Sequence, residues 1–137
     1  MIALDTSVLM DLYSDNPALI TKAKHYMQQV RDEGGVISST LLAELIFHLT
    51  RSRSQNLAIE AVAFIEEYPL LSIANTTPEI ATLAGHLRNK YYHRTKSDMS
   101  FLDAIHLATA IQCKADTFVT TDSDFSGIEE LPVDIYR

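Results

Sequence analysis

Cysteine, glycine and proline are scarce in this sequence, and it contains no long apolar run. A single cysteine, Cys113, excludes an intrachain disulfide and agrees with a reducing cytoplasm as the place of action. No apolar run approaches the roughly 20 residues that cross a bilayer. The opening MIALDTSVLMDLYSDN carries Asp5 and Asp11 and no lysine or arginine, unlike a signal peptide. We therefore expect a cytoplasmic protein without a membrane segment or a leader, whose first strand begins at Met1.

Basic residues are also few. Eleven lysines and arginines stand against 18 aspartates and glutamates, which gives a formal net charge of −7. Proteins that hold nucleic acid through bulk charge are usually basic, so this composition argues against a general DNA- or RNA-coating role. It does not argue against an enzyme that reaches phosphates through a bound metal ion, because the cations that offset clustered carboxylates are not part of the sequence.

The length and composition favour one compact domain. The sequence has no repeat, low-complexity stretch or linker, and its four glycines and four prolines lie where turns are expected. A chain of 137 residues, 47% of them hydrophobic, can bury one full core and leaves little room for a second. We expect a single domain over residues 1–137.

Hydrophobic periodicity and turn residues divide the chain into short apolar strands that alternate with helices. The expected strands cover residues 2–5, 36–37, 70–73, 117–120 and 133–136. The expected helices cover residues 6–13, 18–33, 40–49, 55–67, 77–92 and 101–113. This alternation predicts a parallel sheet with helices on both faces, a three-layer α/β/α fold. Ligands of such sheets bind beyond the carboxyl ends of the strands, near the point where strand order reverses.

Two aspartates directly follow buried strands. Asp5 ends the first strand in IALDTSVL, and Asp122 follows the fourth in FVTTDSDF, so both are expected on the ligand side of the sheet. An acid in such a position must be solvated, paired or metal-bound. Simpler interpretations exist, because Asp5 or Thr6 could cap the first helix and Asp122 could lie in a plain turn.

Two further acids lie in helices. Glu44, in LLAELIFHL, has apolar neighbours and lacks a capping-box spacing, although it could be a solvated helix glutamate. Asp103, in SFLDAIHLATA, does have the capping-box spacing, counted from Ser100. His106 shares a helix face with Asp103, where it could bind metal, form an ion pair or be a satisfied histidine.

The four carboxylates are more informative together than singly. They come from four separate segments, and such a cluster repels itself without cations. Oxygen-only ligands suit Mg²⁺ or Mn²⁺, which can activate water and stabilise the leaving oxygen of a phosphodiester. In this interpretation Asp5 and Asp122 flank the ion. Asp103 and Glu44 complete the site, and Glu44 can alternatively orient the attacking water.

The same blocks resemble the PIN-domain family over essentially the whole chain, and in particular the VapC-type toxins of bacterial toxin–antitoxin pairs. The order and spacing of IALDTSVL, SSTLLAEL, SFLDAIHLATA and FVTTDSDF are similar to four blocks of that family. The resemblance implies four catalytic and metal-binding acids, hydroxyl residues that support them, and an occasional fifth acid. The acids are Asp5, Glu44, Asp103 and Asp122, the hydroxyl near the first acid is Thr6 or Ser7, and the fifth acid is Asp124. In the mechanism, Ser7, Thr121 or Asp124 could hold waters or ligands beside the ion, and each could instead be a turn or cap residue.

The resemblance also implies a five-stranded parallel sheet in the order 3-2-1-4-5, which places Asp5 beside Asp122. The implied activity is endonucleolytic cleavage of RNA with Mg²⁺ or Mn²⁺. The implied partners are a second copy in a homodimer and a cognate antitoxin that silences the toxin of a type II pair. The sequence departs from the family at His106, where many members carry an aliphatic residue.

The segment of residues 86–96, HLRNKYYHRTK, concentrates positive charge with no acid among it. Its basic side chains could contact phosphates, and its tyrosines could stack on unpaired bases. The alternative is a solvated helix end, where basic side chains favour the helix dipole. The candidates for RNA contact are Arg88, Lys90, Tyr91, Tyr92, Arg94 and Lys96, and Arg51 and Arg53 form a second basic pair.

Two other classes of protein are less compatible with the sequence. A phosphatase of the haloacid-dehalogenase type needs a second aspartate two residues after the first, where this chain has Ser7. A non-catalytic module that binds nucleic acid or an antitoxin through the same fold would be marked by a lost acid. None of the four acids is missing.

Overall fold

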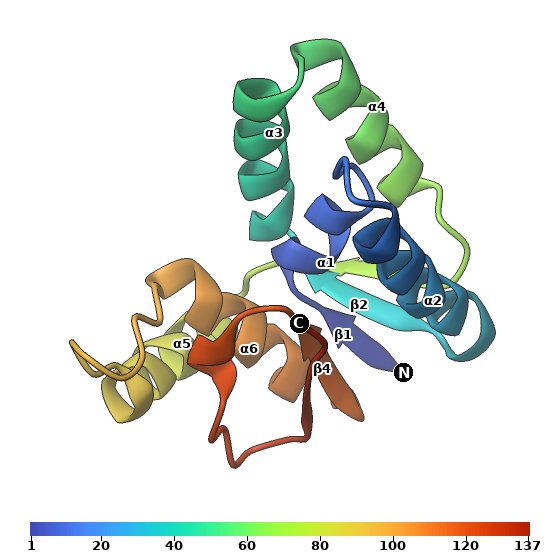
Figure 1. Cartoon of the computed structure of the whole chain (residues 1–137). Coiled ribbons are helices and arrows are strands. Elements are labelled where there is room, and N and C mark those ends of the chain that lie inside the picture. Colours follow the sequence, from blue (N-terminus) through green and yellow to red (C-terminus); the bar gives the residue numbers. More distant parts are fainter.

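A computed structural model describes residues 1–137 and shows five parallel strands in the order β3-β2-β1-β4-β5 (Figure 1). The central strand β1 pairs with β2 on one side and with β4 on the other, so that Ile2 lies opposite both Gly35 and Thr117. The predicted sheet and its order are confirmed. The strands are β1 (Ile2–Leu4), β2 (Gly35–Ser38), β3 (Leu71–Ala74), β4 (Thr117–Thr120) and β5 (Val133–Ile135).

Helices fill the connections between the strands, as the alternating pattern predicts. They are α1 (Thr6–Asp11), α2 (Pro17–Glu33), α3 (Thr40–Ser52), α4 (Gln55–Glu66), α5 (Pro78–Tyr91), α6 (Phe101–Gln112) and the short 3₁₀ helix η1 (Ser123–Phe125). The ends of several elements differ from expectation by one to three residues, and η1 was not predicted. Strand β3 begins after Leu70 because Leu70 adopts a left-handed backbone (φ 62°) and is 63% exposed, as in a turn.

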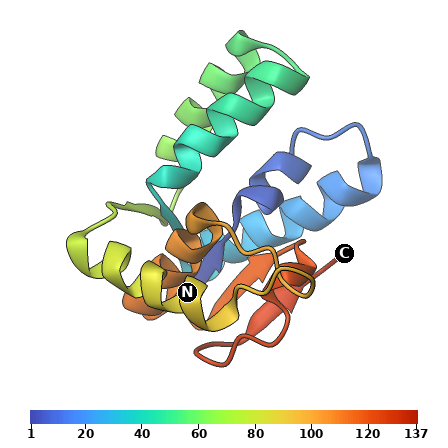
Figure 2. The same ribbon diagram turned by 90° about the vertical axis from the view of Figure 1, so that its left-hand side faces the viewer.

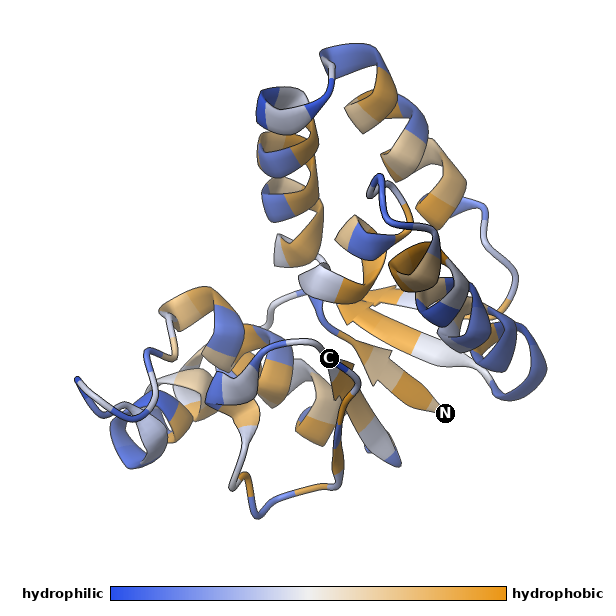
Figure 3. Ribbon diagram, in the orientation of Figure 1, coloured by the Kyte–Doolittle hydropathy of each residue, from blue (hydrophilic) through white to orange (hydrophobic).

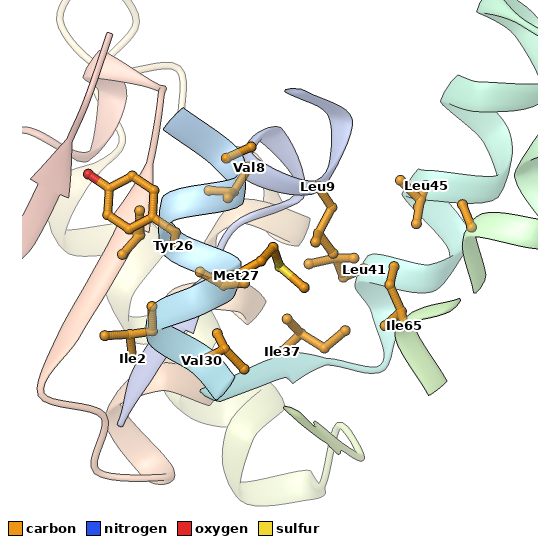
Figure 4. Packing of buried hydrophobic residues seen from close by; sticks show 14 of the residues in the cluster. Ile2, Val8, Leu9, Tyr26, Met27, Val30, Ile37, Leu41, Leu45 and Ile65 are labelled. Atoms are coloured by element: carbon orange, nitrogen blue, oxygen red, sulfur yellow. The ribbon is translucent and has the colours of Figure 1, made fainter. Parts of the chain in front are cut away.

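The sheet separates two hydrophobic cores, since alternate residues of each strand point to opposite faces. Ile2 and Leu4 of β1 pack with α1 to α4, whereas Ala3 between them packs with α5 and α6. Figure 4 shows part of the first core, where residues of α1 to α4 meet β1 and β2. Figure 3 shows the apolar strands between the layers, with hydrophilic residues on the outer side of α2. The helices therefore cover both faces, as predicted.

One glycine allows α2 to pack closely on the sheet. A Cβ at Gly35 would lie 2.7 Å from Cγ2 and 2.9 Å from Cγ1 of Val30, too close for any side chain. The absence of a side chain at Gly35 thus lets the end of α2 lie directly against the start of β2.

The carboxyl edge of the sheet is where the chain enters α1, α3 and η1 and where β5 leads to the last residues. Because all five strands are parallel, these segments meet at one edge, with the C-terminal residues beside them (Figures 1 and 2). No helix in the structure has the length and apolar character needed to span a bilayer.

Candidate active site

An acidic pocket of about 400 Å³ opens at the carboxyl edge of the sheet. Four carboxylates line it, one from the end of β1, one each from α3 and α6, and one from the segment after β4. These are Asp5, Glu44, Asp103 and Asp122, accompanied by Thr6, Ser7 and Thr121. The sequence analysis named all seven residues. The structure adds three that it did not name, which are Met10, His48 and Arg137.

Asp5 is buried and fixed by hydroxyl groups. Ser7 Oγ and Thr120 Oγ1 each donate to Asp5 Oδ2 at 2.8 Å. Asp5 occupies the N-cap position of α1, but its side chain makes no capping hydrogen bond, so the cap interpretation is wrong. Ser7 Oγ also accepts from the backbone N–H of Thr121 at 3.1 Å, which ties the end of β4 to α1. These bonds hold the Asp5 carboxylate at the junction of the two central strands.

Asp122 turns the chain after β4. Its Oδ1 accepts from the backbone N–H of Asp124 at 2.8 Å and so caps η1. The turn interpretation is therefore correct, yet the same side chain also lines the pocket. Burial raises the pKa of Asp122, and the negative charges of Asp124, Asp5 and Asp98 act in the same direction, against the hydrogen bond from Asp124. Asp124 itself does not line the pocket.

Asp103 also combines a structural and a site position. Its Oδ2 accepts from the backbone N–H of Ser100 at 2.8 Å, and its own N–H donates to Ser100 Oγ at 3.1 Å. The predicted capping box is therefore formed. Only one carboxylate oxygen takes part in it, and Oδ1 has no protein partner. Burial raises the pKa of Asp103, and the charges of Asp5 and Asp122 add to that shift, against the bonds from Ser100.

Glu44 is not a solvated helix residue, because its side chain is only 19% exposed. Thr6 Oγ1 donates to Glu44 Oε1 at 2.8 Å, and His106 Nε2 forms a very short contact with the same oxygen. Burial acts to raise the pKa of Glu44, but the interactions with His106 and the bond from Thr6 outweigh it, so the pKa lies below its ordinary value. This network joins α1, α3 and α6 beneath the pocket.

His106 therefore has a role that its sequence neighbourhood did not reveal. The sequence placed it on one helix face with Asp103, but its Nε2 faces Glu44 and Thr6 instead. Its side chain is 1% exposed and does not line the pocket. Its Nδ1 is buried without a hydrogen-bond partner. The only signal in the sequence was a histidine where the family favours an aliphatic residue.

The donor set of the pocket fits a hydrated divalent ion. A nearby cation would stabilise the ionised forms of Asp103 and Asp122, whose pKa values are raised. The donors of the four acids are oxygens, which suit such an ion, and His48 adds a nitrogen to the lining. No three acidic, histidine or cysteine side chains converge closely enough to coordinate one ion directly. Mg²⁺ commonly takes only one or two carboxylates from a protein and keeps several waters. Direct contact with two acids, with water between the ion and the others, is compatible with this spacing.

The comparison with known proteins agrees with this architecture. Residues 2–131 match the PIN domain profile, which covers nearly the whole chain. The chain belongs to the PIN-domain family. No curated protein sequence matches it significantly. Among solved structures, a PIN-domain neighbour is VapC20 of Mycobacterium tuberculosis, a toxin that cleaves the sarcin-ricin loop. It is 19% identical with a TM-score of 0.74, over 96% of this chain and 98% of that chain.

Two further solved structures are similar over nearly the whole chain. VapBC2 of Rickettsia felis, solved on a promoter DNA fragment, is 20% identical with a TM-score of 0.76 and 98% coverage of both chains. FitAcB of Neisseria gonorrhoeae is 20% identical with a TM-score of 0.72, over 98% of this chain and 96% of that chain. At these identities the likeness shows a shared PIN-domain fold.

In this PIN domain, the basic segment of residues 86–96 is largely engaged within the protein. The Arg88 guanidinium lies over the rings of Tyr92 and Phe101, at 4.5 and 4.3 Å from their centres, and its Nε donates to a backbone carbonyl. Lys90 pairs with Glu129 and Glu130 at 3.1 and 3.0 Å. The tertiary structure thus brings acids to a segment that contains none in the sequence.

The other candidates for RNA contact divide into two groups. Tyr91 donates its hydroxyl to Glu130 at 2.6 Å, and Arg53 pairs with Asp15 at 2.9 Å, so both serve contacts within the fold. Arg94 and Lys96 are exposed in the turn that joins α5 to α6 and have no ion pair. None of the candidate RNA-contact residues lines the acidic pocket.

Proposed function

We propose that this PIN-domain protein is an endoribonuclease that hydrolyses RNA phosphodiester bonds with Mg²⁺ or Mn²⁺. The observation that carries the proposal is the convergence of Asp5, Glu44, Asp103 and Asp122 from four separate segments on one pocket. The pocket lies at the carboxyl edge of a parallel sheet, where such folds bind their ligands. A non-catalytic binding module would have no need for four partly buried and mutually repelling carboxylates.

The protein's own residues have separable roles in this proposal. Asp5 and Asp122 would hold the divalent ion, and Asp103, which lines the same pocket, keeps its Oδ1 free of the capping box. A bound ion supplies positive charge to the phosphate and lowers the pKa of a bound water. Glu44, oriented by Thr6 and His106, accepts the proton of the attacking water and aligns that water with the phosphorus. Ser7 and Thr120 keep the Asp5 carboxylate in place.

We further propose that the protein is the toxin of a type II toxin–antitoxin pair, acts as a homodimer and is silenced by a cognate antitoxin. This proposal is supported by PIN-domain neighbours that come from VapBC complexes, two of them bound to DNA. The substrate class is supported by VapC20, whose described target is an RNA loop.

The deciding experiment compares cleavage of labelled single-stranded RNA by the wild type and by Asp103→Asn, with Mg²⁺, with Mn²⁺ and with a chelator. An asparagine can still accept the N–H of Ser100, so the variant keeps the capping box and loses only the charge. Asp32→Asn, on the exposed face of α2, is the matched control.

We expect cleavage by the wild type and by Asp32→Asn that requires metal, and a loss of at least about a hundredfold in Asp103→Asn. Equal cleavage by Asp103→Asn would overturn the assignment of the pocket. A folded wild type that binds RNA but cleaves none over a broad set of sequences would favour the binding module instead.

A further inference from the structure

The acidic pocket contains one side chain with a permanent positive charge, Arg137, which follows β5. Four carboxylates in one pocket repel a phosphate as strongly as they attract cations. The proposed divalent ion offsets part of this repulsion, and a positive side chain in the pocket would offset more of it by direct contact with a phosphate. The basic segment of residues 86–96 does not line this pocket, whereas Arg137 does.

Arg137 is held in place by a buried acid. Its Nη2 donates to Asp11 Oδ1 at 2.5 Å, and the side chain of Asp11 is only 4% exposed. The other oxygen of Asp11 accepts from Tyr136 OH at 2.8 Å, and the Tyr136 ring packs on Tyr26 with 5.0 Å between ring centres. A buried carboxylate paired on both oxygens fixes the direction of the arginine that it binds.

The rest of the Arg137 guanidinium is available to a ligand. Its side chain is 48% exposed, and the bond to Asp11 is its one hydrogen bond in the structure. A guanidinium carries five N–H donors in a planar fork, so one side can bind Asp11 while the other binds a phosphate.

We propose that Arg137 binds a phosphate oxygen of the RNA held in the acidic pocket, with Asp11 as the residue that positions it. This inference rests on the proposed ribonuclease function and adds a substrate-binding residue to it. The competing explanation is that Arg137 only neutralises the buried charge of Asp11. The two explanations differ in whether RNA affinity and its salt dependence change with Arg137.

The test measures binding of short, labelled, single-stranded RNA of random sequence in Mg²⁺, using Asp103→Asn as the non-cleaving parent. Arg137→Ala would leave Asp11 buried without a cation and endanger folding. We therefore use Arg137→Gln, whose amide can still donate to Asp11, and the double variant Asp11→Asn/Arg137→Gln, which removes both charges.

Two further variants serve as controls. Tyr136→Phe removes the other hydrogen bond of Asp11 and leaves the arginine. Arg31→Gln removes a positive charge from the last turn of α2, which leads into the amino-terminal end of β2 and not into the pocket.

We expect Arg137→Gln and the double variant to bind RNA about tenfold more weakly than the parent. The slope of log affinity against log salt should fall by about 0.7, as for the loss of one phosphate contact to a single strand. Tyr136→Phe and Arg31→Gln should keep the parent's slope.

Three outcomes would overturn the inference, and they separate it from the proposed function. An unchanged slope and affinity in both Arg137 variants would show that the arginine only neutralises Asp11. A loss in Tyr136→Phe as large as in Arg137→Gln would attribute the effect to the shape of the pocket. In either case metal-dependent cleavage by the wild type would leave the ribonuclease proposal intact, whereas a parent that binds no RNA together with a wild type that cleaves none would remove both.

Discussion

Replacing His106 by leucine tests whether the buried network around Glu44 serves stability or catalysis. The side chain is fully buried in α6, and leucine has a similar volume, so the substitution leaves no large cavity. It removes the contact of Nε2 with Glu44 and the 3.2 Å contact with Thr6 Oγ1. It also removes Nδ1, which has no partner in the fold.

The expected change in stability is small because two contributions oppose each other. A hydrogen bond to a charged group contributes about 1.5–3 kcal/mol, and the lower end applies here because Glu44 is 19% exposed and can recruit water. A buried nitrogen without a partner costs about 1–3 kcal/mol, and leucine removes that cost. We therefore expect His106→Leu to change the free energy of unfolding at neutral pH by no more than about 1 kcal/mol.

We expect His106→Leu to have a larger effect on the rate of RNA cleavage than on the free energy of unfolding. Glu44 keeps only the bond from Thr6 in the variant, so its carboxylate can occupy other rotamers. Misplacement of a catalytic group by a fraction of an ångström costs about tenfold or more in rate. We expect kcat for RNA cleavage to fall by about that factor, with KM little changed because Glu44 orients water and does not bind the RNA.

The pH dependence supplies an independent measurement. The folded pKa of Glu44 lies below its ordinary value of 4.5, so its ionised form stabilises the fold above that value, and this stabilisation is lost as the pH falls through the folded pKa. His106→Leu removes interactions that lower this pKa. Its stability should therefore decline less than that of the wild type below about pH 5.

Urea denaturation at several pH values and steady-state cleavage together check the prediction, with His86→Leu on the exposed face of α5 as the control. A destabilisation of about 3 kcal/mol or more would refute the cancellation argument. An unchanged kcat in a stable variant would show that His106 does not position Glu44 for the reaction.

Two further predictions concern the packing of the sheet and the charge of the pocket. Gly35→Ala should cost about 1–3 kcal/mol in urea denaturation, because both methyls of the β-branched Val30 block the new Cβ. Gly85→Ala, in α5 with nothing within 4 Å, should instead stabilise by about 0.5–1 kcal/mol, and equal effects would contradict the close approach of α2. With a chelator, the thermal midpoint should rise as the pH falls from neutral to about pH 5, above the range in which the stabilising charge of Glu44 is lost. The reason is that the raised pKa values of Asp103 and Asp122 make their ionised forms unfavourable in the fold, and protonation relieves this. Asp103→Asn should show less of this rise and a smaller stabilisation by Mg²⁺ at neutral pH, and a curve parallel to that of the wild type would contradict the repulsion.

Much of the fold could be predicted from the sequence because its signals are local. The alternation of apolar strands and amphipathic helices is set by residues within a few positions of one another, and a parallel sheet follows from the connections between them. Asp5 and Asp122 could be placed at one edge of the sheet by the same reasoning, since each follows a strand and parallel strands end at one edge. Their position side by side followed from the strand order that the family resemblance implies. The capping box of Asp103 could be predicted because it is a local motif, whose two partners are three residues apart.

Contacts between distant residues could not be predicted in this way. Glu44 and His106 are 62 residues apart, and they meet because α3 and α6 pack against each other and both contact β2. Lys90 was a candidate for RNA contact, but in the folded chain it forms ion pairs with Glu129 and Glu130 from the loop before β5. Neither contact can be inferred from the hydrophobic periodicity of the segments that contain the two partners.

The sequence by itself determined the order of the elements, the two apolar faces of the sheet and the identity of the acids at its carboxyl edge. Only the tertiary structure decided how those acids are held and what accompanies them. Arg137 illustrates the difference, because it lies 126 residues from Asp11 and reaches the pocket only when β5 completes the sheet. Periodicity reports which side of an element is buried, whereas the partner of a polar side chain depends on which elements the folded chain places next to it.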